Sequence, residues 1–115
     1  MKVAIFIKNN ELTTLHEEKV RVVIFNMEKD KVVGVENVIL EEQTKDSIIS
    51  WLHQKSINQI YLSEIDDQTH YKINLKNIRV KTLETLKSDK LFNSLALSSF
   101  KLNKPSLPQK TAYAV

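Results

Sequence analysis

The chain has 115 residues, of which 42% are hydrophobic and 27% are charged, with one glycine and no cysteine. These values are typical of one globular domain, and the absence of thiols excludes disulfides and thiolate-bound metal clusters. The formal net charge of +3 lies in Lys101, Lys104 and Lys110, because the remaining 14 (17 − 3) basic residues balance 14 acidic ones, so nucleic acid is not expected as a partner.

The N-terminal residues predict two strands separated by a loop. Residues 3–7 form a continuous apolar run, which is typical of a central strand covered on both faces. The polar residues 8–18 are expected to form a long loop. Residues 20–25 are rich in β-branched side chains and predict the second strand.

A third strand is expected to follow by a short connection. Residues 26–30 are polar enough for a hairpin turn, and residues 31–40 contain four valines and an isoleucine. Gly34 falls inside this third strand, where a glycine marks a bulge or a bend more often than a ligand site. Three consecutive strands of this kind predict an antiparallel meander.

The period of the apolar residues then changes to that of a helix. Thr44 is a suitable N-cap and Asp46 suits the first turn. Ile48, Ile49 and Leu52 fall on one helical face, which is expected to pack on the sheet.

Strands and helices alternate in the remaining sequence. Residues 57–63 predict a strand, and Asp66 or Asp67 can cap a second helix. The apolar residues of that second segment fit both periods, and Asn77 can supply the left-handed position that ends the helix. Residues 78–80 predict the last strand. A third helix is expected to begin at Ser88 and Asp89, with three residues facing inward: Leu91, Phe92 and Leu95.

The element order is therefore β-β-β-α-β-α-β-α, which places the chain in the α/β class. Short connections make the first three strands antiparallel, whereas right-handed crossovers make the last strands parallel to the first. A mixed five-stranded sheet of order 3-2-1-4-5 satisfies both rules. We expect one domain over residues 1–98, followed by a basic, flexible C-terminal tail over residues 99–115.

Several stretches resemble the dinitrogenase iron-molybdenum cofactor biosynthesis family, which includes NifX and the C-terminal part of NifB. The resemblance covers roughly residues 1–97, and it lies in the following stretches: residues 1–5, His16 before the second strand, residues 22–26, 31–33, 51–52, 57–62 and 77–80. It implies a ribonuclease H-like fold with the same element order. It also implies binding of an iron-containing cluster.

The two loops that carry the family's motifs are altered in this chain. Members typically have His-Phe-Gly in the first loop and a glycine-rich turn after the fourth strand. Here residues 15–18 read Leu-His-Glu-Glu and residues 62–66 read Leu-Ser-Glu-Ile-Asp. Carried over to these positions, the resemblance retains only His16 and Ile65, so the cofactor-binding role that it implies rests on His16. Glu64 and Asp66 complete the set of cofactor-binding candidates through their place in the second loop.

The predicted topology brings the same two loops together. They follow adjacent parallel strands at their carboxyl ends, where open α/β sheets bind ligands. His16, His70 and Glu64 then form a candidate metal site, since two histidines and one carboxylate suffice for a non-haem metal. The alternative is that Asp66 or Asp67 caps a helix and that both histidines are surface residues.

No catalytic constellation is found, because the first strand lacks the acid of a two-metal nuclease and no serine lies in a nucleophile-elbow motif. We therefore expect a non-enzymatic binding protein for a small ligand. The alternative is an interaction or regulatory module that kept the fold and lost the ligand, with a protein as its partner. No signal peptide or membrane span is present in this sequence, so the expected location is cytoplasmic.

Overall fold

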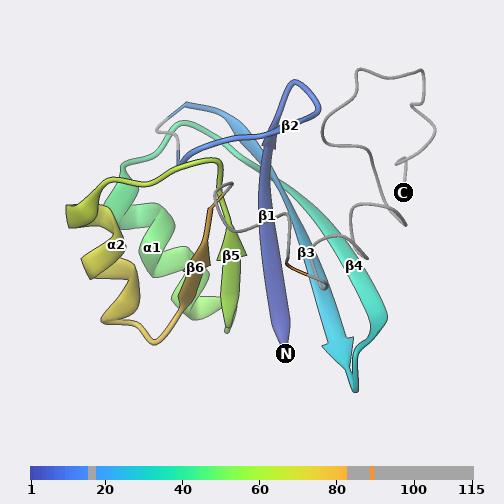
Figure 1. The fold of residues 1–115 in the computed structure, drawn as a ribbon. Helices are drawn as coiled ribbons and strands as arrows, with labels where there is room; N and C mark the ends of the chain where they lie inside the picture. The colour runs from blue at the N-terminus through green and yellow to red at the C-terminus, as the bar shows by residue number, and fades with distance from the viewer. Residues whose placement is uncertain (16–17, 83–88, 90–115) are drawn as a thin grey trace.

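A computed structural model describes residues 1–15, 18–82 and 89 of the protein. In these residues the chain forms a mixed α/β fold, drawn in Figure 1. The elements, in chain order, are β1 (Lys2–Lys8), β2 (Glu11–Leu12), β3 (Val20–Glu28), β4 (Lys31–Leu40), α1 (Lys45–Gln54), β5 (Gln59–Tyr61), α2 (Asp67–Asn74) and β6 (Arg79–Lys81).

The sheet is mixed, as predicted. Its main path runs β4-β3-β1-β5-β6, and β2 pairs with the end of β1. β1 is antiparallel to β3, and β3 is antiparallel to β4. β1 is parallel to β5, and β5 is parallel to β6. The carboxyl ends of β1, β4 and β5 consequently share one edge of the sheet, and both helices begin from this edge.

The short strand β2 corrects the expectation that residues 8–18 form only a loop. Asn9 and Asn10 have φ angles of 56° and 65°, so a two-residue turn folds Glu11 and Leu12 back onto β1. Two successive left-handed residues are the signature of the type I′ hairpin turn, and asparagine tolerates this conformation better than other non-glycine residues. The Asn-Asn pair was the signal for this hairpin.

The turn between β3 and β4 is equally tight. Lys29 and Asp30 have φ angles of 51° and 66°, so the predicted connection over residues 26–30 narrows to these two residues. Asn26 pairs with Gly34 and Met27 pairs with Val32, which leaves Val33 as an extra residue in β4. The bulge expected next to the glycine is confirmed.

Both described helices begin at N-cap residues that the sequence predicted. The backbone N–H of Ser47 donates to Thr44 Oγ1 over 3.0 Å at the start of α1, and that of Thr69 donates to Asp66 Oδ2 over 3.0 Å at the start of α2. The ambiguous second segment is a helix, because Ile73 is buried while Tyr71 is exposed. Asn77 adopts a φ of 62° after it, as predicted.

Two apolar clusters lie on opposite faces of the sheet. On one face, Ile48 and Leu52 of α1 and Ile73 of α2 pack with Phe6 of β1. Figure 1 shows both helices beside β5 and β6. On the other face, the cluster consists of Val3, Ile5, Ile7, Val23, Phe25, Met27 and Tyr61. β1 is therefore buried on both faces, which confirms it as the central strand.

A polar network crosses the edge of the second cluster. Gln59 Nε2 donates to the Tyr61 hydroxyl over 3.0 Å, and that hydroxyl donates to Asp89 Oδ1 over 3.0 Å. Lys81 Nζ lies 3.6 Å from Asp89 Oδ2, and the Asp89 side chain is only 8% exposed. Burial, followed by the nearby charge of Asp89, raises the pKa of Tyr61 above its ordinary value. Asp89 is thereby fixed against β5 and β6.

Two predictions lie outside the described residues. These are the third helix with Leu91, Phe92 and Leu95, and the division of the chain into residues 1–98 and 99–115. Neither described helix is long and apolar enough to cross a membrane.

Candidate functional site

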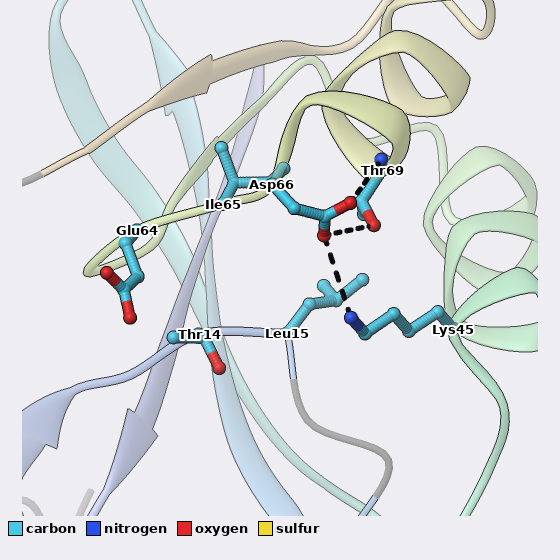
Figure 2. Close-up of a pocket in the computed structure, with 7 residues that line it drawn as sticks. All are labelled: Thr14, Leu15, Lys45, Glu64, Ile65, Asp66 and Thr69. Atoms are coloured by element: carbon cyan, nitrogen blue, oxygen red, sulfur yellow. Dashed lines mark hydrogen bonds and ion pairs between the residues drawn. The ribbon is translucent and has the colours of Figure 1, made fainter.

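A pocket of about 330 Å³ lies where the segment after β2 meets the loop between β5 and α2. Figure 2 shows the seven residues that line it: Thr14, Leu15, Lys45, Glu64, Ile65, Asp66 and Thr69. The two segments are joined directly, because the Ser63 N–H donates to the Thr13 carbonyl oxygen over 3.0 Å. The expected meeting of these two loops is thus confirmed.

Asp66 is held in the wall by its role as a helix cap. Besides the bond from the Thr69 backbone, Asp66 Oδ1 accepts a 2.6 Å hydrogen bond from Thr69 Oγ1. These bonds from Thr69, with a smaller contribution from Lys45, lower the pKa of Asp66 from its ordinary 3.8 to about 2. The carboxylate is therefore ionised at neutral pH, and Thr69 fixes its orientation.

Lys45 brings a positive charge to the pocket that the sequence analysis missed. It is the first residue of α1, and its Nζ lies 3.6 Å from Asp66 Oδ1. Figure 2 shows the lysine reaching from α1 toward the start of α2. The signal was the pair of caps at Thr44 and Asp66, since both helices begin at the sheet edge where the loops meet. Thr14 and Thr69 add hydroxyl groups that sequence reasoning also missed.

Glu64 contributes the second carboxylate. It is exposed on the β5–α2 loop and lines the pocket wall together with Thr14 from the facing segment. Among the described residues, no hydrogen bond or ion pair engages its side chain. Glu64 is therefore the carboxylate that remains available to a ligand, whereas Asp66 is already used by Thr69 and Lys45.

Of the two histidines of the predicted metal site, the structure describes only His70. His70 lies in α2, where its backbone N–H bonds to the Asp66 carbonyl oxygen over 3.0 Å, and it is not among the pocket-lining residues. His16 lies outside the described residues. Within the described part of the chain, no three His, Asp or Glu side chains are grouped closely enough to hold a metal ion. The set of His16, His70 and Glu64 remains a prediction.

Comparison with known proteins finds similarity in structure and not in sequence. No family model matches the chain, and no curated protein matches it. Among solved structures, the crystal structure of PH0822 is similar, with a TM-score of 0.57 and 18% sequence identity. The match covers 71% of this chain and 76% of that chain. At this identity the likeness indicates a shared fold and carries no statement about function.

Proposed function

We propose that this protein is a non-enzymatic binding protein that holds a small, metal-containing ligand in the pocket between the β1–β3 and β5–α2 connections. The observation that carries the proposal is that Glu64 and Asp66 line one pocket with Lys45 at the carboxyl edge of parallel strands. Ligands bind at this edge in open α/β sheets. The proposal includes a ribonuclease H-like fold and a relationship to the iron-molybdenum cofactor biosynthesis family.

The chemistry of the pocket limits what the ligand can be. Glu64 supplies a carboxylate, a ligand type that iron accepts, and Leu15 in the wall precedes His16 in the chain. A cluster bound by cysteine thiolates does not fit, because the chain has no cysteine. We therefore favour iron as cargo held by carboxylate and imidazole groups, with Lys45 and the two threonines available to polar or anionic parts of the ligand.

Anaerobic reconstitution with iron and sulfide, followed by absorbance spectroscopy and metal analysis, tests this function. We expect retained iron in the wild-type protein and a loss of most of it in His16→Ala and Glu64→Gln. Glu28→Gln and His53→Ala are matched controls. Glu28 ends β3 at the opposite edge of the sheet, and His53 lies in the last turn of α1.

Two results would contradict the proposal. One is a wild-type protein that retains no iron, and the other is equal iron in all four variants. Nuclear magnetic resonance provides an independent readout, since bound ferrous iron broadens nearby amide signals. The broadening should be strongest at Thr14 and Glu64 and absent at Glu28.

A further inference from the structure

The strand β4 forms an apolar edge of the sheet. In the described part of the chain it pairs with β3 alone and stands at one end of the strand order. Four of its side chains are large, apolar and substantially exposed: Val32 (40%), Val33 (54%), Val35 (47%) and Ile39 (48%). Together they account for most of the exposed large apolar side chains in the described residues.

Such an edge is unusual for a protein that stays alone in solution. Edge strands expose unpaired backbone groups, and natural proteins protect them by shortness, by inward charges, by proline or by bulges. β4 is ten residues long and contains no proline. Its bulge at Val33 interrupts only the start, because residues 34–40 pair with β3 in regular register. This regular stretch can accept another strand.

The stretch has a defined apolar side. Val35 pairs with Phe25, Asn37 with Val23 and Ile39 with Arg21, so these three β4 residues share the face of the second apolar cluster. Glu36 and Val38 point to the opposite face, where Glu36 Oε2 lies 3.0 Å from Lys55 Nζ. An added strand therefore meets apolar side chains at Val35 and Ile39, separated by one polar residue.

We infer that β4 pairs antiparallel with β4 of a second copy of this chain, about a two-fold axis at Asn37. In this register Val35 of one copy faces Ile39 of the other, and Glu36 faces Val38. Directly opposed residues of antiparallel strands lie on the same face, so both apolar contacts continue the second apolar cluster across the dimer. The proposal is independent of the ligand proposed above.

The neighbouring symmetric registers fit less well. An axis at Glu36 places two carboxylates directly opposite each other, which destabilises a sheet pair. It also sets Val35 against Asn37. An axis at Val35 brings the bulge residue Val33 into the paired stretch, where the extra residue disrupts the ladder. Of these three axes, charge and backbone regularity favour the one at Asn37.

The first test is the oligomeric state of the full chain. Sedimentation velocity over a range of concentrations should show a monomer–dimer equilibrium. Val35→Lys should weaken the dimer at least tenfold, because two lysines then enter the apolar contacts. Val32→Lys is the matched control, since it adds the same charge to an exposed valine of β4 outside the paired stretch. A wild-type protein that is monomeric throughout would overturn the inference, as would equal weakening by both variants.

The second test fixes the register. The chain has no cysteine, so Asn37→Cys introduces a single thiol. Directly opposed residues of antiparallel strands have Cα atoms about 4.5–5.5 Å apart, which suits a disulfide. We expect rapid oxidative cross-linking of Asn37→Cys and slow cross-linking of Glu36→Cys. Faster linking at Glu36 would overturn the proposed axis. A monomer in which Val35→Lys shifts only amide signals of residues 111–115 would assign the edge to the chain's own C-terminus and overturn the dimer.

Discussion

The Tyr61 hydroxyl donates a 3.0 Å hydrogen bond to Asp89 Oδ1, which joins β5 to a residue beyond β6. Tyr61 is fully buried and lies in the cluster on the face opposite α1 and α2. Gln59 donates to the same hydroxyl, so the tyrosine acts as both donor and acceptor. One phenol group thus links the interior of the sheet to the chain that follows it.

Replacing Tyr61 with phenylalanine should destabilise the fold. The ring still fills the core, but the buried Gln59 amide loses its acceptor and Asp89 loses a donor. A buried polar group without its hydrogen-bond partner lowers the free energy of unfolding by about 1–3 kcal/mol. Urea unfolding measures the loss, and Tyr71→Phe is the control because Tyr71 is 65% exposed. Equal stability of the two variants would show that the network contributes nothing.

Tyr61 should also make the protein sensitive to alkali. Its pKa is raised in the folded state, so this group's contribution to stability is complete below the unfolded tyrosine pKa of about 10 and is lost as pH rises above it. We expect Tyr61 to form tyrosinate only on unfolding. Ultraviolet absorbance and circular dichroism recorded through the same titration should therefore show an absorbance step that coincides with the loss of folded structure. Tyr61→Phe should abolish this absorbance step, and its persistence would contradict the assignment.

Asp66 should make the stability of the protein sensitive to acid. Because its pKa falls from 3.8 to about 2 on folding, its contribution to stability is complete above pH 3.8 and is lost as pH falls toward 2. Carbon-detected nuclear magnetic resonance gives the pKa directly. Asp66→Asn preserves the cap and should flatten the stability profile in this range, whereas Asp67→Asn, next in the chain, should leave it intact.

The β3–β4 turn offers a gain in stability. Lys29 and Asp30 occupy left-handed conformations that cost non-glycine residues energy. The double replacement Lys29→Asn with Asp30→Gly installs the preferred type I′ pair and should stabilise the protein by about 1–2 kcal/mol. Thermal unfolding provides the measurement. A lower melting temperature would mean that the native pair makes compensating contacts.

Gly34 should tolerate a side chain, although it is the one glycine of the protein. Its φ is not positive, and an added Cβ would lie 3.6 Å from Asn26 Cβ, which is an ordinary contact. Gly34→Ala should therefore leave stability unchanged or raise it by up to about 1 kcal/mol, through a less flexible unfolded chain. A loss greater than that in urea unfolding would show that the bulge requires glycine.

Much of the fold could be read from local patterns. The apolar run at residues 3–7 predicted a strand buried on both faces, and Thr44 and Asp66 predicted where the two helices begin. Connection lengths then decided which strands are parallel. The hairpin at Asn9 and Asn10 was missed because a two-residue strand has too few side chains to show a period of two.

The candidate site was only partly predictable, for a different reason. Glu64 and Asp66 follow a predicted strand, so their place at its end could be inferred from the sequence. Lys45 could not be assigned in this way, because its approach to Asp66 depends on how α1 and α2 pack on the sheet. The structure also shows that Asp66 caps α2 through its hydrogen bonds from Thr69. From the sequence, this capping role was one alternative and ligand binding was the other.

The parallel pairing of β1 with β5 has a consequence for synthesis of the protein. β1 can join β3 and β4 as soon as residue 40 has emerged from the ribosome, since that meander is local in sequence. The other edge of β1 can pair only after β5 has been synthesised, since Ile5 pairs with Tyr61. Contacts so distant in sequence form late and slow folding. The nascent chain therefore carries its most apolar strand half-covered, which makes this interval the time when chaperones matter most to it.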